Sequence, residues 1–168
     1  MEVALQFFNE MEAAGLMSRY AIGGAMAAYF YAEAVVTEDL DAFILLAEPP
    51  SGLLTLTPIC EFLKTRGAIE RREHLVLAGT LVQLIPAYDA LTEEAVQQAI
   101  ERRVGLTTTR VMRPEHLIAI ALKTGRGKDQ MRVALLLEEA EVDTPLLTGI
   151  LERHQLLDRW KQCKLAQP

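Results

Sequence analysis

Two aspartates separated by one residue, shortly after a pair of glycines, place the strongest constraint on how this chain folds. The glycines are Gly23 and Gly24, and Asp39 and Asp41 open the apolar run Asp39–Leu46. The run is apolar on both faces beyond its second aspartate, which predicts a central strand. Alternate residues of a strand point to the same face, so the two carboxylates project together, about 7 Å apart along the strand.

This arrangement of charges and glycines predicts a particular kind of chemistry. Two carboxylates held this close repel each other unless a cation lies between them. A divalent metal is the usual solution, because oxygen ligands suit Mg²⁺ or Mn²⁺. The glycine pair allows backbone N–H groups to approach a ligand closely at the start of a helix, where phosphate is favoured. The residues therefore predict a site for a metal and a nucleoside triphosphate (NTP).

The same stretch resembles the signature of the nucleotidyltransferase superfamily, the DNA polymerase beta-like fold. The resemblance rests on G-G followed by D-L-D and apolar residues, and Thr37–Asp41 is similar to the T-x-D-h-D form of small stand-alone bacterial members. A second stretch, Arg113–Asp129, resembles the P-E-x-L and K-x-x-x-R-x-K-D segment that follows the catalytic sheet in these proteins. The two matches span about Ile22 to Leu137, which is most of the chain.

The resemblance implies roles for particular residues. Asp39 and Asp41 would hold Mg²⁺ or Mn²⁺, and Gly23 and Gly24 would contact the β- and γ-phosphates. The cations that would neutralise the triphosphate are Lys123, Arg126 and Lys128. The reaction would be attack of a hydroxyl acceptor on the α-phosphate of an NTP, with pyrophosphate leaving. Compensation of dipoles at two helix ends is the alternative explanation for the cations.

The sequence departs from the family pattern at the expected third carboxylate. Such enzymes carry it on a neighbouring strand, where it helps to hold metal and acts as base toward the acceptor. Here that strand offers Gln83, whose neutral amide ligates a metal weakly and cannot take a proton. Glu73, expected on the partner strand, is the other candidate for the third position. The arginine that often precedes the T-x-D motif by two residues is replaced by Val35.

Three functional hypotheses follow from these residues. The first is a small nucleotidyltransferase that acts on a tRNA end, a protein hydroxyl or a small molecule such as an aminoglycoside. The second is a catalytically degenerate member that binds a nucleotide or a protein partner, as in toxin–antitoxin or abortive-infection pairs. The third is an interaction module, for which Asp39→Asn with Asp41→Asn would raise stability and cost no activity. Each of these hypotheses is compatible with a homo-oligomer.

Composition narrows the class of protein and of partner. A chain of 168 residues, 51% hydrophobic and 24% charged, is long enough for one core with a helical extension. Its net charge of −6 argues against extensive nucleic-acid or anionic-membrane binding, and no apolar run is long enough to span a bilayer. Cys60 and Cys163 form no C-x-x-C and no basic leader is visible, so a cytoplasmic location is expected. His74, His116 and His154 lack metal-ligand spacing, which disfavours a zinc site.

Periodicity and turn residues predict strands and helices in the first two-thirds and helices alone in the last third. The expected fold class is α/β (α+β), a nucleotidyltransferase-like mixed sheet flanked by helices over residues 1–112, with a C-terminal helical subdomain over residues 113–168. The expected strands besides Asp39–Leu46 are Arg19–Ile22, the hairpin Glu73–Leu77 and Thr80–Ile85, and Thr107–Val111. The expected helices are 2–14, Ala25–Ala34, Thr57–Arg66 with Thr57 as N-cap, Thr92–Arg103 with Thr92 as N-cap, Pro114–Lys123, Lys128–Glu139, Pro145–His154 and from there to Lys164. A loop is expected over residues 48–52, and Tyr29 and Tyr31 are expected to fill the core.

Overall fold

A mixed sheet forms the centre of the protein in the computed structural model, which describes residues 1–33, 37, 39–47 and 55–165. The strands are β1 (Met17–Ile22), β2 (Asp39–Leu46), β3 (Ile69–Arg71), β4 (His74–Leu77), β5 (Thr80–Pro86), β6 (Ile100–Val104) and β7 (Thr107–Val111). They form one seven-stranded sheet in the order β3-β4-β5-β2-β1-β7-β6. Because β2 has a strand on each side, the expected central position of Asp39–Leu46 is confirmed.

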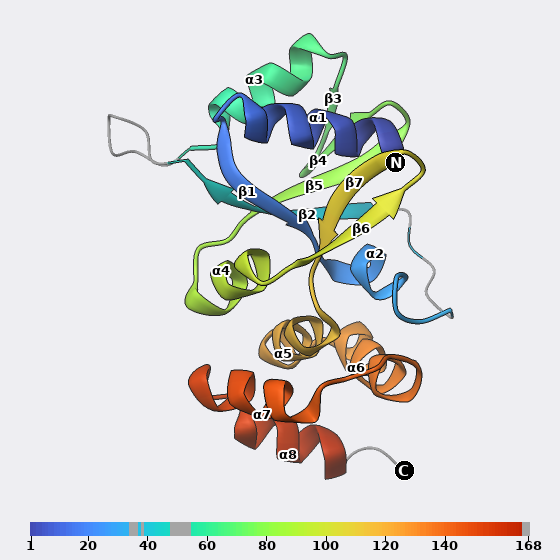
Figure 1. The fold of residues 1–168 in the computed structure, drawn as a ribbon, viewed down its shortest axis with the longest axis vertical. Helices are drawn as coiled ribbons and strands as arrows, with labels where there is room; N and C mark the ends of the chain where they lie inside the picture. The colour runs from blue at the N-terminus through green and yellow to red at the C-terminus, as the bar shows by residue number, and fades with distance from the viewer. Residues whose placement is uncertain (34–36, 38, 48–54, 166–168) are drawn as a thin grey trace.

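The helices are arranged in layers on the two faces of this sheet. They are α1 (Glu2–Ala13), α2 (Gly24–Ala28), α3 (Thr57–Thr65), α4 (Ala90–Gln97), α5 (Pro114–Thr124), α6 (Gly127–Glu139), α7 (Thr144–Arg153) and α8 (Leu157–Leu165). Figure 1 shows α1 and α3 on one face and α2 and α4 on the other, with α5 to α8 beyond them. The C-terminal helices therefore lie on the α2 and α4 side of the sheet.

The register of β2 decides which of its side chains reach each layer. β2 is antiparallel to β1 and parallel to β5, and Asp39 and Asp41 lie beside Leu81 and Gln83. Leu40 points to the opposite face, where it is fully buried. The face that carries the aspartates is the one toward α2, as the contacts described below establish.

The opposite face of the sheet packs on α1 through aromatic side chains. Tyr20 lies beside Ile44 in the register of β1 and β2, and its ring meets Phe8 of α1 edge-on at a centroid distance of 5.2 Å. All three residues are buried, so the core is continuous from α1 through the sheet. Burial of this apolar surface is the dominant stabilising contribution to the fold.

One helix expected from the sequence is half wrong. Thr92–Arg103 was predicted as helix, but α4 ends at Gln97 and the following residues form the edge strand β6. The predicted N-cap is also shifted, since Asp89 is the N-cap and Thr92 is the third residue of a capping box. Asp89 Oδ1 accepts hydrogen bonds from the N–H groups of Leu91 (3.0 Å) and Thr92 (3.1 Å).

Other local predictions also need correction. α2 is five residues long rather than extending to Ala34, and the side chain of Tyr29 is 58% exposed instead of filling the core. Tyr31 is partly buried and donates a hydrogen bond to Met112 O (2.9 Å). Thr57 is the first residue of α3 rather than its N-cap, and β3 was not predicted. Val35 and the loop over residues 48–52 lie outside the described residues.

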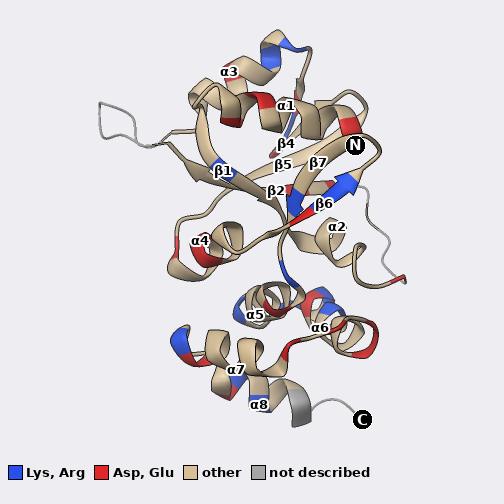
Figure 2. Ribbon diagram, in the orientation of Figure 1, with Lys and Arg blue, Asp and Glu red and all other residues tan. Residues whose placement is uncertain are grey.

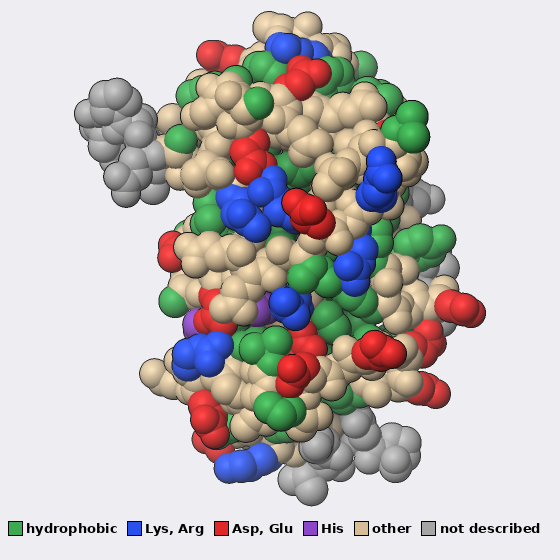
Figure 3. Space-filling view, viewed as in Figure 1, with side chains coloured by type: hydrophobic (Ala, Val, Ile, Leu, Met, Phe, Trp, Pro, Cys, Tyr) green, Lys and Arg blue, Asp and Glu red, His purple; other side chains and the backbone are tan. Residues whose placement is uncertain are grey.

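Charged side chains of both signs are distributed over the sheet and the helices. Figure 2 shows Lys and Arg alternating with Asp and Glu along the chain, and the face in Figure 3 carries both signs side by side. No broad basic surface covers that face, as a net charge of −6 would suggest. Among the helices of the described ranges, none is long and apolar enough to cross a bilayer.

Candidate functional site

The Asp39–Asp41 end of β2 lies against the start of α2. Gly24 has a φ of +59°, and a Cβ at this position would overlap the Oδ2 atom of Asp41. A Cβ on Gly23 would lie 2.5 Å from the ring of Phe43. These contacts place Asp39, Asp41 and Phe43, which share one face by alternation, on the side of α2. They also explain why the sequence has glycine at both positions.

The backbone N–H groups of the two glycines have different roles. The N–H of Gly23 donates to Asp41 O (2.9 Å), so it belongs to the sheet. The first bond within the helix runs from Ala27 N to Gly23 O (3.0 Å). The N–H groups of Gly24, Ala25 and Met26 precede that bond and have no partner within the helix. Three backbone donors therefore start beside the Asp41 carboxylate.

The Asp41 carboxylate is mostly buried among charged groups. Burial raises its pKa above the usual value, Arg132 lowers it, Asp39 raises it further, and Lys128 and His74 lower it. Within the described chain, the carboxylate oxygens of Asp39 and Asp41 accept no hydrogen bond and form no ion pair. Two hard oxygen donors without protein partners fit a divalent cation of the Mg²⁺ or Mn²⁺ class.

Cations at the start of α6 face this carboxylate pair across the layer boundary. Asp129, in the first turn of α6, is only 1% exposed and accepts from Arg126 Nε (2.7 Å) and Arg132 Nη1 (3.3 Å). Arg126 and Lys128 both act electrostatically on Asp41. The buried Asp129 thus fixes two arginines in place, and α6 presents positive charge to β2.

The third predicted phosphate-binding cation has a different partner. Lys123, at the end of α5, forms an ion pair with Asp89 Oδ1 at 3.1 Å. Asp89 is the N-cap of α4, so this contact joins α5 to α4. Arg126 and Lys128 therefore lie within electrostatic range of Asp41, whereas Lys123 lies at the start of another helix.

The two candidates for the third position lie in different places. Gln83 is beside Asp41 in the parallel register of β2 and β5, on the same face of the sheet. Glu73 was expected on a strand, but β4 begins one residue later and Glu73 lies exposed in the turn after β3. Among the described residues, no group of three or more His, Cys, Asp or Glu side chains is arranged to hold a metal. Next to Asp41 in the register, β5 therefore offers a neutral amide rather than a third carboxylate.

Sequence reasoning did not single out two residues that the fold brings to this site. Arg132 lies one helical turn after Asp129, a spacing that places the two on the same face of α6. His74 reaches the site only through the pairing of β4 with β5, and no local pattern in the sequence reports that register.

A second charged cluster ties α4 to the C-terminal helices. Glu94 of α4 contacts Arg153 Nη2 (2.5 Å), His154 Nε2 (2.8 Å) and His116 Nε2 (3.3 Å). Burial by itself would raise the pKa of Glu94, but these partners outweigh it and lower the pKa to about 2. His116 is fully buried, its Nδ1 has no hydrogen-bond partner among the described residues, and burial lowers its pKa. The cluster serves the packing of α4 on α5 and α7.

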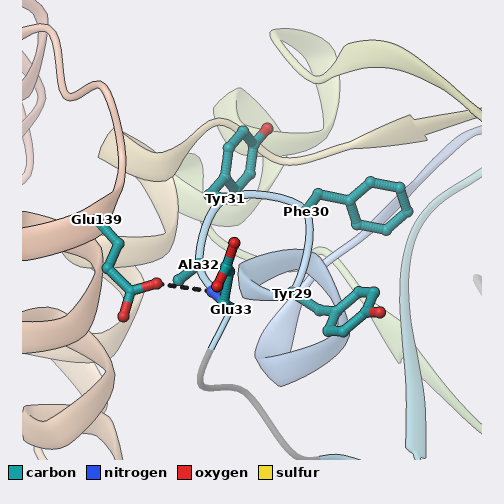
Figure 4. A pocket seen from close by; sticks show the side chains of 6 residues that line it. All are labelled: Tyr29, Phe30, Tyr31, Ala32, Glu33 and Glu139. Carbon is teal, nitrogen blue, oxygen red and sulfur yellow. Dashed lines mark hydrogen bonds between the residues drawn. The ribbon is translucent and has the colours of Figure 1, made fainter.

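A pocket of about 740 Å³ opens where the chain leaves α2. It is lined by Tyr29, Phe30, Tyr31, Ala32, Glu33 and Glu139. Figure 4 shows Tyr29 and Phe30 extending to one side and Tyr31 to the other, with Glu139 reaching in from α6. Glu139 Oε2 accepts a hydrogen bond from Glu33 N at 2.7 Å, which links α6 to this segment.

No protein-family model and no curated protein sequence matches this chain, but several solved structures share its fold. The solution structure of the antibiotic-resistance factor ANT(2'')-Ia is 14% identical, with 98% of this chain and 97% of that chain covered, at a TM-score of 0.53. The crystal structure of ANT(2'')-Ia in complex with adenylyl-2''-tobramycin is 15% identical, with 94% of this chain and 98% of that chain covered, at a TM-score of 0.53.

An antigenic nucleotidyltransferase-like protein from Paracoccidioides brasiliensis is also similar to this chain. It is 13% identical, with 96% of this chain and 90% of that chain covered, at a TM-score of 0.53. At these identities the likeness shows the fold alone. The expected fold class is confirmed, because the chain has a nucleotidyltransferase-like fold over nearly its full length, with a mixed seven-stranded sheet and C-terminal helices.

Proposed function

We propose that this nucleotidyltransferase-fold protein binds an NTP with a divalent metal at the Asp39–Asp41 end of β2 and transfers the nucleoside monophosphate to a hydroxyl acceptor. The observation that carries the proposal is the meeting of three features at one place. Two carboxylates project from β2, backbone donors without a partner inside the helix begin at Gly24 beside them, and cations of α6 act electrostatically on Asp41.

Asp39 and Asp41 hold the metal in this proposal. Both side chains lie on one face of β2, and carboxylate oxygens are the ligands that Mg²⁺ and Mn²⁺ prefer. The bound ion supplies Lewis-acid stabilisation of charge on the transferring phosphate. The buried environment of Asp41 strengthens its interaction with any cation placed there.

The triphosphate is held by backbone and by α6. The N–H groups of Gly24, Ala25 and Met26 donate to phosphate oxygens, and the missing side chain at Gly24 leaves room for the Asp41 carboxylate beside these donors. Arg126 and Lys128 neutralise charge from the opposite side. Arg132 joins them, since it shares Asp129 with Arg126 and acts on Asp41.

The acceptor is a compound with a nucleophilic hydroxyl. One structurally similar protein was solved with adenylyl-2''-tobramycin, which makes a small polyhydroxylated molecule a reasonable first class to test. Protein hydroxyls and the end of a tRNA are the other classes. The net charge of −6 makes RNA the least favoured of the three.

A second candidate is a catalytically degenerate protein that binds a nucleotide or a protein partner, as in toxin–antitoxin pairs. The observation that favours it is Gln83, the neutral amide in register with Asp41. A neutral amide neither balances a second metal nor accepts a proton. In this case nucleotide binding persists without transfer.

The first test is thermal unfolding with Mg²⁺ or Mn²⁺ and each of the four NTPs, on the parent and on Asp39→Asn/Asp41→Asn. An NTP at 100 times its Kd stabilises the folded state by about 2.7 kcal/mol, which raises Tm by roughly 5 °C or more. We expect a metal-dependent rise in the parent and none in the double variant.

The readout is the NTP-induced change in Tm within each protein. Removing two repelling carboxylates itself raises the starting Tm, so absolute values are not compared. No NTP-induced rise in the parent with any NTP contradicts the proposal. Transfer is then measured as pyrophosphate release with tobramycin, total tRNA or water as the acceptor, and binding without release selects the degenerate candidate.

A further inference from the structure

A row of polar side chains crosses the sheet from Asp41 toward the β3 edge. Asp41 lies beside Gln83, and His74 lies beside Arg71. The β4–β5 pairing runs from Leu77 opposite Thr80 to Leu75 opposite Val82, and continuing it by one residue sets His74 opposite Gln83. The order across β2, β5, β4 and β3 is therefore Asp41, Gln83, His74 and Arg71.

Alternation places all four of these side chains on the face that carries the aspartates. The neighbouring row on that face is Asp39, Leu81, Val76 and Ile69. Leu75 and Leu77 point the other way and are buried, as Leu40 and Val82 are. The imidazole of His74 thus belongs to the same surface as the metal-binding pair.

This part of the surface is open to a substrate. Val76 and Leu81 are partly exposed, His74 and Gln83 are partly exposed, and Ile69 at the edge is 67% exposed. Neighbouring strands lie about 4.8 Å apart, so the Cα atoms of His74 and Asp41 are about 10 Å from each other.

An electrostatic interaction gives independent support for this proximity. Burial dominates the raised pKa of Asp41, and His74 is one of the groups that oppose it. The groups around His74 are Arg71 of β3, Gln83 of β5 and Asp41 of β2, together with Cys60 of α3, Glu70, Arg72 and Glu73, which line a small cavity with it. His74 and Asp41 therefore interact across the strand that separates them.

We propose that His74 is the general base of the transfer reaction, taking the role that Gln83 cannot perform. This inference rests on the proposed function. In the step, the acceptor oxygen forms a bond to the α-phosphorus of the NTP, the bond to pyrophosphate breaks, and the hydroxyl proton passes to a ring nitrogen of His74. Histidine is the side chain most often used for such proton transfer.

The test compares variants by pyrophosphate release from the NTP that binds, with water as the acceptor. His74→Gln should lower kcat by about 100-fold, the ordinary contribution of a general base, while KM for the NTP stays unchanged. Glu101→Gln is the control, because it changes an exposed carboxylate on the edge strand β6, at the other side of the sheet, and it should leave kcat unchanged. The NTP-induced rise in Tm reports whether each variant still folds and binds.

A rescue experiment separates proton transfer from a structural role. Gln83→Asp sets a carboxylate beside Asp41, so the double variant His74→Gln/Gln83→Asp should recover at least tenfold of the lost rate. His74→Asn provides a second substitution if His74→Gln does not fold. A rate retained in His74→Gln, or lost without rescue by Gln83→Asp, overturns this inference and leaves the proposed function standing. Absence of pyrophosphate release from the parent with water, tobramycin and total tRNA alike overturns both, whereas absence of any NTP-induced change in Tm locates the failure at nucleotide binding.

Discussion

At Gly24 the backbone of α2 begins directly against the carboxylate of Asp41. Its φ of +59° lies in the left-handed region, and any Cβ would occupy the position of Asp41 Oδ2. The residue therefore meets two demands at once, a backbone conformation and a close contact. Only the close contact with Asp41 concerns the site. Mutation can separate it from the backbone requirement, because other glycines of this chain have a left-handed backbone without such a contact.

We expect Gly24→Ala to abolish the NTP-induced rise in Tm. The new methyl displaces the Asp41 carboxylate, and the left-handed backbone adds a cost of about 1 kcal/mol in stability. Gly67→Ala is the matched control, since Gly67 has a φ of +83° and a Cβ there meets nothing within 4 Å. It should lose about the same stability and keep the NTP response. An unchanged NTP response in Gly24→Ala would show that this contact does not shape the site.

Among the helices and strands, local sequence signals are sufficient to predict those elements whose ends carry turn or capping residues. Pro114 at the first turn and Gly125 at φ +72° bound α5 almost where the sequence predicts. The Ala78-Gly79 turn defines the β4–β5 hairpin, and the apolar run after Asp41 defines β2. In each case the residues that specify the element lie within it or at its ends.

The elements that were missed depend on distant partners. Residues 100–104 include Glu101, Arg102 and Arg103, which read as a helix surface, but they pair with β7 across a two-residue turn at Gly105-Leu106. Pairing with a neighbouring strand overrides the weak helical preference. β3 is three residues long and exists only through its pairing with β4.

The candidate site divides in the same way. Alternation along one strand was enough to place Asp39 and Asp41 on one face. The position of His74 depends on two strand pairings, and that of Arg132 on how α6 packs toward β2, so neither follows from local sequence. Lys123 is a case in which a local pattern misleads. Its place in the motif predicts that it binds phosphate, but in the fold it pairs with Asp89.

The connection between α5 and α6 provides a test with matched lysines. We expect Lys128→Gln to reduce the NTP-induced rise in Tm, because Lys128 lies in the electrostatic field of Asp41. Lys123→Gln should leave that rise unchanged, since its amine pairs with Asp89. Both are Lys-to-Gln changes within six residues of each other, so a general effect of net charge alters both equally. Equal losses from the two variants would contradict this division of roles.

At the scale of the whole molecule, Glu94 joins the sheet layer to the C-terminal helices. It belongs to α4, which packs on the sheet, and its partners come from α5 and from the end of α7. The Glu94 side chain is only 17% exposed, so water screens these contacts less than at the surface. Glu94 therefore makes three of the contacts that cross this boundary, and the Lys123–Asp89 ion pair makes another.

Stability should depend on the ionisation of Glu94 in acid. Its pKa in the fold is about 2 against an ordinary 4.5, so the ionised form stabilises the folded state by at most about 3 kcal/mol. This contribution is fully present above about pH 4.5 and is lost as the pH falls toward 2. Glu94→Gln should lower the free energy of unfolding at pH 7 and flatten its decline between pH 4.5 and 2.

Urea unfolding across that pH range provides the measurement, with Glu93→Gln as control. Glu93 is the exposed neighbour of Glu94 in the same helix, and its substitution should leave the pH dependence unaltered. Equal pH profiles for the parent and Glu94→Gln would contradict the assignment of the acid response to this cluster.

The parallel register of β2 and β5 also has a consequence for how this protein changes over generations. It keeps residue 83 beside Asp41, and the codons for glutamine and glutamate differ only at their first base. A single nucleotide substitution therefore sets a third acidic side chain on that face of the sheet without altering any strand pairing. Selection on this one codon is therefore enough to change the group beside Asp41 from an amide to a carboxylate, or back again.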